Sequence, residues 1–521
     1  MSTHVKNCRS RIPRGVCSAL QGGRQVPRRT LHSGNAYVAH DPNEPLHAVD
    51  PKVGFAVKDN IATKGSPTTC ASNILAGQEI AFSATIVQQL QRQDLVVAGK
   101  TNMDEFGMGS HSTASAYGSV SNASPLEARS AGGSSGGSAV AVSTGTTHLA
   151  LGTDTGGSVR MPAAYTKTVG FKPSYGMISR WGVVPYANSL DTVGLIARTV
   201  DEIQSVVKDI RGEHDPRDPT SLSETTRKRC IARERHVPRD LADYEGDWLQ
   251  GLTFGIPIEY NIEELDSRIK DGWMQAAEKI QQLGGRVVPV SLPSTKNALS
   301  AYYVIAPAEA ASNLSKYDGI RYGKRAKEAT SDALEGVLYA KTRGDGFGPE
   351  VKRRILLGSY TLSSKAIDNY FIQAQKVRQL VRKDFDRVFK LPNPLRDVAP
   401  FDLSEMDESI SLETKLGPTQ VDFIICPTAP TPPPTLEDVA KQTPLDAYMN
   451  DVFTVPASLA GLPAISIPMD IPVDTTNEVE KHLDFGGLQI IGQYWDDVML
   501  LAIANGVSRE ISSHTANLYN P

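Results

Sequence analysis

Two short stretches rich in glycine and serine decide the fold of this sequence: residues 132–138 read GGSSGGS, and residues 152–160 read GTDTGGSVR. Glycine and serine alone are typical of a flexible linker. The segment between them, however, is small and apolar, with a helical pattern over Ala139–Ser143 and a strand pattern over His148–Leu151. A flexible tether does not contain such core-forming segments. Both stretches are therefore predicted to be loops of a folded site.

The flanking pattern predicts an α/β fold. Gly54–Val57 reads as a strand that ends at Lys58, Ala84–Arg92 as a helix, and Leu95–Ala98 as the next strand. Short apolar runs alternate with helical patterns in this way from about Val53 onward. Such alternation is typical of a largely buried sheet with helices packed on it.

Composition narrows the functional classes. The 521 residues are 40% hydrophobic and 21% charged, as in ordinary soluble globular proteins. Apolar runs such as Leu149–Gly152 and Phe423–Cys426 are far shorter than the roughly 18 residues of a spanning helix, so no membrane association is expected. A net charge of -4 argues against a dominant nucleic-acid-binding surface. The five cysteines show no CxxC spacing, which indicates a reducing compartment and neither a disulfide framework nor a metal site.

The first 40 residues differ from the rest. They carry seven Lys and Arg residues, many Ser and Thr, and no Asp or Glu, which is typical of a mitochondrial transit segment. A disordered basic tail is the alternative. We expect residues 41–521 to form a single domain, with polar surface insertions at 211–247 and 392–419. The basic run Arg227–Arg229 in the first insertion is expected to face water, with a contact to RNA as the weaker alternative.

The order of the elements predicts that the two glycine-serine loops meet. A helix that begins near Ser134 and a strand that returns antiparallel to it bring the helix N-terminus and the carboxyl end of the strand to one edge of the sheet. Ser158 follows that strand, and in a parallel sheet the strand ending at Lys58 reaches the same edge. Because α/β sheets bind ligands outside the carboxyl ends of their strands, this edge is the predicted active site.

The second loop has the residue types of an oxyanion hole. Gly156 and Gly157 allow the backbone to approach a substrate and to turn successive N–H groups inward. We therefore expect the amides from Thr155 to Ser158 to hold the negative charge that develops on a substrate carbonyl oxygen.

Ser158 is the predicted nucleophile, and it needs a base. A lysine has an ordinary pKa of about 10.4, so Lys58 can accept a proton near neutral pH only where burial or nearby positive charge favours its neutral form. We expect Lys58 to take a proton from Ser134, which takes one from Ser158. The alternative for Lys58 alone is an ion pair with Asp59 or a surface position.

Other motif interpretations fit less well. Gly132–Gly136 satisfies the G-x-S-x-G pattern of a nucleophile elbow, but the preceding Ser124–Ala131 is not strand-like. No G-x-x-x-x-G-K-[ST] phosphate loop and no H-E-x-x-H metal motif occur in the sequence. Nothing in the sequence therefore predicts a metal or a cofactor in this chain.

The combination of VKDN at 57–60, GGSSGGS at 132–138 and LGTDTGGSVRMPA at 151–163 resembles the amidase signature family. The resemblance implies that Lys58, Ser134 and Ser158 form a Ser-cisSer-Lys triad with an acyl-enzyme on Ser158. It also implies a single domain with a central mixed sheet of about eleven strands flanked by helices.

Further segments resemble a branch of that family, the glutaminase subunits of tRNA-dependent amidotransferases: AVKDNIATKG, TTCAS, GKTNMDEFGMGS, NLSKYDGIRYG, GFGPEVKRRILLGSY and NDVFTVPASLAGLPAISIP. This resemblance implies that the chain hydrolyses glutamine and passes ammonia to a companion B subunit, which amidates Glu-tRNA(Gln) with ATP and magnesium. A small accessory subunit is also implied. The chain lacks the helices that normally precede the VKDN strand in that branch, and together with the basic arm this suggests a complex of the mitochondrial matrix.

The same resemblance implies a substrate pocket. A free glutamine presents a carboxylate and an ammonium, which require an arginine and an acid. Arg354 is placed on the α-carboxylate, Asp451 on the α-amino group and Tyr302 beside them. From the residues alone, Arg354 could instead be a surface charge and Asp451 a helix cap.

Two functions of other classes stay open on the sequence alone. A stand-alone amidase for other small or fatty amides would need only the triad. A non-catalytic scaffold that kept the fold would need none of it, although all three triad residues are present.

Overall fold

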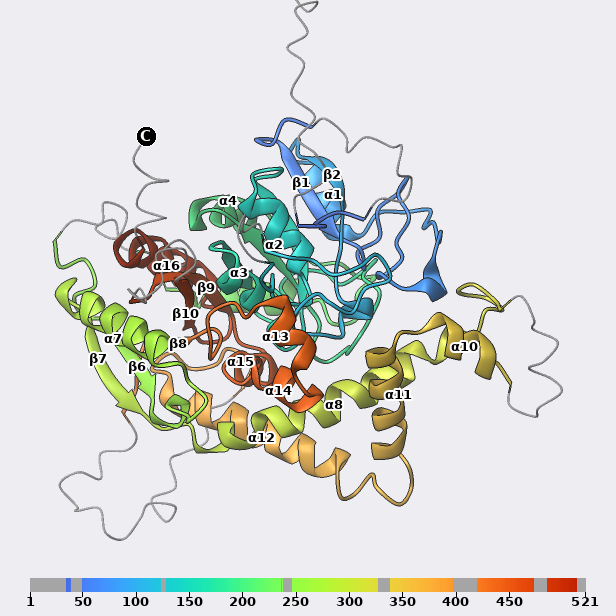
Figure 1. Ribbon diagram of the computed structural model, residues 1–521. Helices are drawn as coiled ribbons and strands as arrows, with labels where there is room; N and C mark the ends of the chain where they lie inside the picture. The colour runs from blue at the N-terminus through green and yellow to red at the C-terminus, as the bar shows by residue number, and fades with distance from the viewer. Residues whose placement is uncertain are drawn as a thin grey trace, which may run out of the picture.

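One mixed sheet of ten strands organises the part of the chain that the structure describes, in the order β2-β1-β3-β5-β4-β9-β10-β8-β6-β7 (Figure 1). The computed structural model describes residues 34–38, 49–122, 128–235, 237, 246–326, 338–396, 419–472 and 485–512. The strands are β1 Gly54–Lys58, β2 Val96–Thr101, β3 Leu149–Asp154, β4 Val169–Lys172, β5 Thr192–Ala197, β6 Thr253–Pro257, β7 Arg286–Val290, β8 Phe423–Pro427, β9 Ala464–Asp470 and β10 Phe485–Ile491.

Helices cover both faces of this sheet (Figure 1). The helices are α1 Thr85–Gln91, α2 Gly136–Ser143, α3 Arg160–Tyr165, α4 Val200–Ile210, α5 Glu224–Ile231, α7 Ser267–Gln282, α8 Ala298–Asn313, α10 Ala340–Gly346, α11 Pro349–Thr361, α12 Phe371–Val388, α13 Leu436–Lys441, α14 Pro444–Met449, α15 Val455–Ala460 and α16 Asp497–Ile511. Helix α2 packs on one face, and α4 and α16 pack together on the other. The predicted α/β architecture is confirmed.

Strand directions place the parallel pairs at the two ends of the sheet. Strand β1 runs parallel to β2 and to β3, and β6 runs parallel to β7 and to β8. The five pairings between these groups are antiparallel. The carboxyl ends of β1 and β3 therefore lie side by side, as the predicted active-site edge requires.

The expected number of strands was slightly too high, since the described residues contain ten rather than about eleven. Outside β2, at that edge of the sheet, Tyr37 pairs with Thr101 through an isolated antiparallel bridge. A single bridge is too short to count as a strand. The predicted strands at Gly54–Val57 and Leu95–Ala98 and the helix at Ala84–Arg92 are confirmed as β1, β2 and α1, within the usual uncertainty at their ends.

The alternation of side chains along β1 explains why Lys58 points toward the site. Phe55 and Val57 join the main core, whereas Ala56 packs in a separate cluster with residues of α2. Lys58 is two residues after Ala56 and therefore projects to the same face of the sheet. The sequence of the strand thus aims the lysine at the N-terminus of α2.

Three long helices, α8, α11 and α12, form a layer beside the sheet (Figure 1). Helix α11 packs closely on α8, because a Cβ added at Gly358 would lie 2.0 Å from the carbonyl oxygen of Pro307. Tyr302 lies on α8 and Arg354 on α11. The helical layer therefore carries two of the predicted pocket residues.

The expectation that the basic run Arg227–Arg229 faces water is wrong for Arg227, which is buried. Its guanidinium donates to the carbonyl oxygens of Gly176 and Met177, both at 2.9 Å. Arg227 lies within helix α5. Arg227 therefore fixes this segment to the body of the protein. The predicted transit arm, and residues 397–418 of the second predicted insertion, lie outside the described residues, apart from 34–38 in the arm.

Candidate active site

Lys58 is the buried centre of the site. Its Nζ lies 2.7 Å from Oγ of Ser134 and 2.8 Å from Oγ of Ser135. It also donates to Thr153, at 3.0 Å to Oγ1 and 3.3 Å to the carbonyl oxygen. The lysine side chain is fully buried, so these hydroxyl and carbonyl groups replace its hydration shell.

Burial shifts Lys58 toward its neutral form. Loss of hydration lowers the pKa of the ammonium to about 7, although the buried carboxylates of Asp104 and Asp154 act in the opposite direction. Among the described residues, Nζ contacts hydroxyl and carbonyl oxygens rather than a carboxylate, so none of them forms an ion pair that would hold the proton on it. The alternatives of an ion pair with Asp59 and of a surface lysine are therefore excluded: Asp59 instead lies 3.4 Å from Lys100.

The first glycine-serine loop is shaped by close contacts. A Cβ added at Gly133 would lie 2.2 Å from Oδ2 of Asp104 and 2.6 Å from the backbone nitrogen of His111. Only glycine fits there. The peptide bond between Gly133 and Ser134 is cis, and the carbonyl oxygen of Ser134 accepts a hydrogen bond of 3.3 Å from the N–H of Asp104. These contacts hold Ser134 beside Lys58.

Asp104 links the first glycine-serine loop to the segment that follows Asp104 in the sequence. Its carboxylate accepts hydrogen bonds from the N–H groups of Ser112 at 2.8 Å and Ala114 at 3.0 Å. Burial raises the pKa of the Asp104 carboxyl to about 6. Asp104 thus ties the segment 104–114 to the glycine that precedes Ser134.

The second loop meets the first through the backbone. The N–H of Ser135 donates to the carbonyl oxygen of Ser158 at 3.1 Å. The sequence prediction that the two loops meet is therefore confirmed for the backbone, and the Ser158 hydroxyl has no hydrogen-bond partner among the described residues. Ser158 is 9% exposed, the most accessible of the three predicted triad residues.

The amides around Ser158 are turned away from protein acceptors. Within the described residues, the N–H groups of Gly156, Gly157 and Ser158 donate to no protein oxygen. Thr155 is fixed by its hydroxyl, which donates to Asp191 at 2.8 Å, and Gly157 has a φ of +152°. Free, closely spaced N–H groups beside a serine suit a developing oxyanion.

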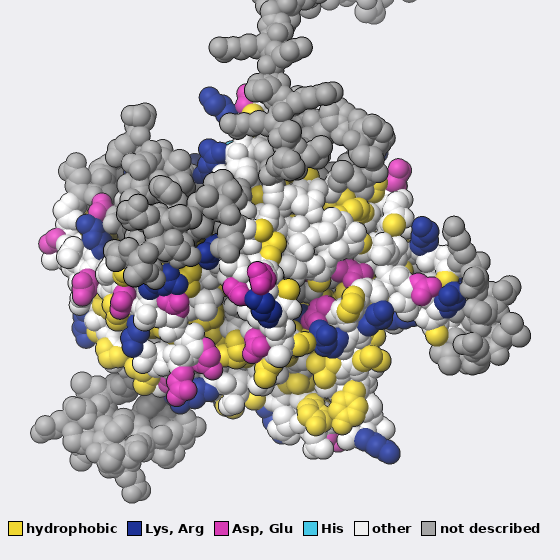
Figure 2. Space-filling model, viewed as in Figure 1, with side chains coloured by type: hydrophobic (Ala, Val, Ile, Leu, Met, Phe, Trp, Pro, Cys, Tyr) yellow, Lys and Arg dark blue, Asp and Glu magenta, His cyan; other side chains and the backbone are white. Residues whose placement is uncertain are grey.

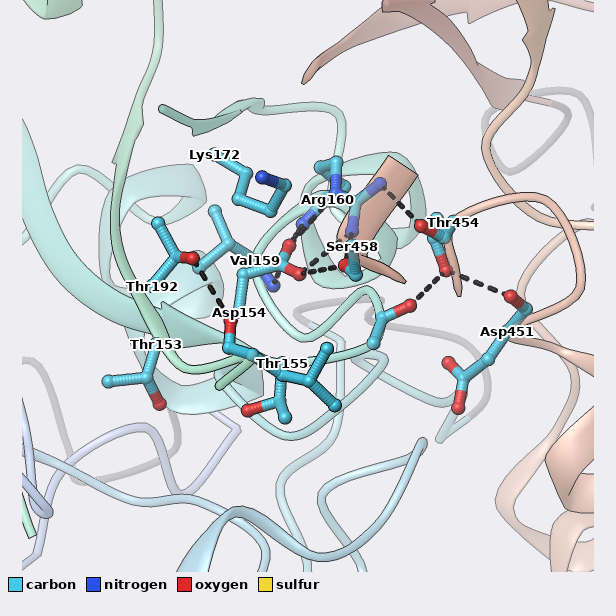
Figure 3. Close-up of polar contacts among 12 residues, drawn as sticks. Thr153, Asp154, Thr155, Val159, Arg160, Lys172, Thr192, Asp451, Thr454 and Ser458 are labelled. Carbon is cyan, nitrogen blue, oxygen red and sulfur yellow. Dashed lines mark hydrogen bonds and ion pairs between the residues drawn. The ribbon is translucent and has the colours of Figure 1, made fainter. Parts of the chain in front are cut away.

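A buried ion pair between Asp154 and Arg160 joins the two ends of the loop that carries Ser158 (Figure 3). Oδ1 of Asp154 lies 2.8 Å from the guanidinium of Arg160, and Oδ2 accepts from the N–H of Val159 at 3.2 Å. Arg160 also donates to the carbonyl oxygen of Thr454 at 2.9 Å and to Oγ of Ser458 at 2.8 Å. The pair therefore fixes both ends of the loop and joins it to the segment after α14.

Thr454 connects the loop to the predicted pocket. Its hydroxyl lies 2.5 Å from the carbonyl oxygen of Gly156 and 3.1 Å from that of Asp451 (Figure 3). A Cβ added at Gly157 would lie 2.3 Å from this hydroxyl. The nucleophile loop and Asp451 are thus held by one side chain.

Arg354 is buried among aromatic rings rather than exposed. Its guanidinium donates to the hydroxyl of Tyr186 at 2.7 Å and pairs with Glu350 at 2.7 Å. The guanidinium carbon lies 5.3 Å from the ring centre of Tyr303 and 5.4 Å from that of Tyr448. The surface-charge alternative for Arg354 is therefore wrong, because the helix turns this residue inward while the two preceding basic residues stay exposed.

Asp451 contacts one of the same tyrosines, Tyr303. Its Oδ2 accepts hydrogen bonds from the hydroxyl of Tyr303 at 2.9 Å and from that of Ser110 at 3.2 Å. Burial raises the pKa of the Asp451 carboxyl to about 7. The carboxylate contacts these side chains and not the N-terminus of a helix, which excludes the capping alternative.

Tyr302 was predicted to lie beside Arg354 and Asp451, and its ring centre lies 4.9 Å from that of Tyr303. The ring of Tyr302 packs against the Ser158 loop, since a Cβ at Gly156 would lie 2.7 Å from it. The hydroxyl that reaches Asp451 belongs to Tyr303. Sequence reasoning missed Tyr303, Asp104 and the Asp154–Arg160 pair, although the last two residues stand inside the GTDTGGSVR stretch.

Two further findings concern the described residues as a whole. They contain no cluster of three or more His, Cys, Asp or Glu side chains with the geometry of a metal site. None of their helices combines the length and apolar character that crossing a bilayer requires.

Comparison with known proteins gives consistent relatives. A family profile described as amidase matches residues 27–501. The mitochondrial A subunit of glutamyl-tRNA(Gln) amidotransferase from Podospora anserina is 60% identical over 465 residues, covering 88% of this chain and 89% of that protein. The protein of the same name from Neurospora crassa is 54% identical and covers 98% of this chain and 99% of its own length.

A solved structure agrees with these relatives. The crystal structure of the A subunit of glutamyl-tRNA(Gln) amidotransferase from Thermotoga maritima superimposes with a TM-score of 0.66 at 34% identity, covering 88% of this chain and 83% of that one. Family profile, sequence relatives and fold thus lead to one conclusion: the chain is an enzyme of the amidase family, in the branch that contains the A subunits of glutamyl-tRNA(Gln) amidotransferases.

Proposed function

We propose that this chain is the glutaminase subunit of a tRNA-dependent amidotransferase. It hydrolyses glutamine, and a companion B subunit uses the ammonia to convert Glu-tRNA(Gln) into Gln-tRNA(Gln). The observation that carries the proposal is that one buried guanidinium, Arg354, and one buried carboxylate, Asp451, both contact Tyr303. The α-carboxylate and α-ammonium of glutamine need one of each.

In the first half of the reaction Ser158 attacks the side-chain amide of glutamine. Neutral Lys58 accepts the proton of Ser134, Ser134 accepts the proton of Ser158, and Oγ of Ser158 forms a bond to the carbonyl carbon. The amides of Thr155, Gly156 and Gly157 stabilise the oxyanion, at about 3 kcal/mol for each such donor. When the C–N bond breaks, the proton returns through Ser134 to the leaving nitrogen, and ammonia departs.

In the second half, water hydrolyses the glutamyl ester on Ser158. The same relay removes a proton from the water, and the ester bond breaks as Ser158 recovers its proton. Glutamate is released. The lysine ends each half in the neutral form in which it began.

The pocket orients glutamine for this attack. Arg354 binds the α-carboxylate and Asp451 the α-ammonium, while Tyr302 borders the space beside the Ser158 loop. A substrate with an apolar tail would offer no hydrogen bond to the buried guanidinium or carboxylate, and placing an apolar group against them disfavours fatty amides.

The branch to which the relatives belong supports the assembly that we propose. We assign no cofactor to this chain, and ATP and magnesium to the companion subunit, which activates the glutamyl-tRNA. A small accessory subunit completes the complex, and its place is the mitochondrial matrix. Residues 1–40 act as the transit segment, and 41–521 form a single domain with surface insertions at 211–247 and 392–419.

The direct test is nitrogen transfer by the reconstituted complex. With glutamine labelled by ¹⁵N in its side-chain amide, mass spectrometry should find the label in Gln-tRNA(Gln). If the complex cannot use glutamine as nitrogen donor, the proposal is wrong. If the isolated chain instead turns over apolar amides and ignores glutamine, the stand-alone amidase is the better description.

A further inference from the structure

The outer faces of α11 and α12 carry an exposed apolar surface, here called the α11–α12 surface (residues 352–383). On α11, Leu356 is 71% exposed and Tyr360 is 58% exposed. Figure 2 shows apolar side chains gathered over this helical layer, at the lower right of the molecule. Contiguous exposed apolar patches on soluble proteins mark interaction sites, whereas single exposed apolar residues do not.

Helical spacing aligns the exposed side chains of α11, and one ring contact links them to the start of α12. Lys352, Leu356 and Tyr360 follow one another at intervals of four residues along the exposed side of α11. The ring of Tyr360 lies 5.9 Å from that of Tyr370, the residue that directly precedes α12. That contact joins the exposed stripes of the two helices.

The second helix continues the same pattern. Ile372, Lys376 and Leu380 are also spaced by four residues and are all exposed. Each helix therefore presents two apolar side chains and one lysine in line. An ordinary solvent-facing helix would show polar residues at these positions.

The charge of this surface is strongly one-sided. Among residues 352–383 the exposed charged side chains are Lys352, Arg353, Lys365, Lys376, Lys383 and Asp368, which is five cations against one carboxylate; Arg353 also pairs with Glu350, just before this range. The whole chain, in contrast, has a net charge of -4. The α11–α12 surface therefore complements a partner that is apolar at its centre and acidic at its rim.

We infer that the α11–α12 surface docks a protein subunit of the amidotransferase that presents an apolar face rimmed by carboxylates, an inference that rests on the proposed function. RNA fits less well, because phosphates would leave the leucines and tyrosines without contacts. A second copy of this chain fits less well too, since a two-fold contact would bring the same five cations together.

Docking on the outer side of α11 should affect glutamine binding, because the inner side of this helix carries Arg354. Arg354 lies on α11 between the exposed Arg353 and Leu356 and points inward to the pocket. A protein held on the outer side restrains the helix that carries this guanidinium. Assembly should therefore lower the KM for glutamine more than it raises kcat.

The first experiment measures affinity in the purified complex. Leu356→Glu and Lys376→Glu should each reduce the affinity of this chain for the other protein subunits of the complex about tenfold or more, as expected near the centre of an interface. Val96→Glu is the matched control, since Val96 is 47% exposed and lies on β2, the edge strand of the sheet. It should change the affinity by less than about twofold. Unchanged affinity in the Leu356 variant would overturn the inference.

A second experiment identifies the occupant. When photo-crosslinking benzoylphenylalanine replaces Tyr360 in an otherwise wild-type complex, it should attach to a site rich in Asp and Glu on another protein subunit of the complex. Attachment to a second copy of this chain, to its own acidic segment 397–418, or to tRNA would each overturn the inference. A complex that crosslinks as expected but cannot use glutamine would defeat the proposed function and leave the docking surface standing.

Discussion

Because the pKa of Lys58 is about 7, kcat should depend on pH near neutrality. Lys58 works as a proton acceptor only when neutral, and its neutral fraction rises with pH through its pKa. We therefore expect kcat for glutamine hydrolysis to rise with pH around a midpoint near 7 and to level off above it. Initial rates at saturating glutamine from about pH 5.5 to 9 check this. A flat kcat across that range would contradict the role of Lys58.

Asp451 should affect a different kinetic constant. Its pKa is also about 7, but only the ionised carboxylate can bind the α-ammonium of glutamine, so KM should rise as the pH falls below 7. Asp451→Asn separates the two residues: it should raise KM and remove the pH dependence of KM while the kcat limb of Lys58 remains. If kcat no longer rose with pH in this variant, the rise of kcat near pH 7 in the wild-type enzyme would be due to ionisation of Asp451 and not of Lys58.

Arg354 should discriminate for the α-carboxylate. Arg354→Lys keeps the charge but loses the planar double donor, so we expect KM for glutamine to rise about ten- to a hundredfold. The control substrate is glutaminamide, in which the α-carboxylate is replaced by an amide, and its KM should change little. If both substrates lose affinity equally, Arg354 acts on the shape of the pocket and not on the carboxylate.

Adjacent residues on a helix show where sequence reasoning stops. Lys58, Ser134 and Ser158 could be predicted from motif spacing, because each stands at the end of a strand or the start of a helix. Tyr302 and Tyr303 are neighbours, and only the packing of α8 on α11 decides that Tyr303 reaches Asp451. Arg354 required a resemblance, since nothing local distinguishes it from Arg353.

At the scale of elements, the glycine before Ser134 is the tightest point of the first loop. Gly133→Ala would place a Cβ against Asp104 and the backbone of His111, and because backbone cannot move aside cheaply, we expect a loss of about 1–3 kcal/mol or more in stability and a large loss of activity. Thermal unfolding and glutaminase assays measure both. Gly212→Ala is the control, since nothing lies within 4 Å of its added Cβ. Equal behaviour of the two variants would contradict the packing argument.

Removing only one partner of the buried Asp154–Arg160 ion pair should strongly lower the stability of the protein. Asp154→Asn leaves the buried guanidinium of Arg160 without its counter-ion, and we expect a loss of about 3–5 kcal/mol. Adding Arg160→Met should recover part of that loss, because the uncompensated charge is removed. Urea unfolding of both single variants and the double variant forms the cycle. Strictly additive losses would show that the two residues act independently.

Local elements could be predicted better than their assembly. The strand at β1 and the helix at α1 are visible in the periodicity because each buries its own apolar pattern. Arg227 was misjudged for the converse reason, as a basic run looks the same in solvent and in a buried network of carbonyl oxygens. Long-range partners of a charge are set by the fold and leave no local signal.

At the scale of the whole molecule, the site lies where two distant parts of the chain meet. The residues of the proposed triad come from the first third of the sequence, around β1 and β3, while those of the proposed pocket come from α8, α11 and the segment before α15. The α/β class followed from alternation alone, whereas the joining of these parts depends on antiparallel pairings at the centre of the sheet. Pairings between strands so far apart could not be predicted from spacing.

The measurement that most directly tests the central claim compares two nitrogen donors in the Ser158→Ala complex. With glutamine, formation of Gln-tRNA(Gln) should fall by at least about 10⁴-fold, because the nucleophile is gone. With ammonium chloride, the variant should match the wild-type complex, since the companion subunit receives ammonia without this site. A Ser158→Ala complex that uses glutamine as well as the wild type does would contradict the account.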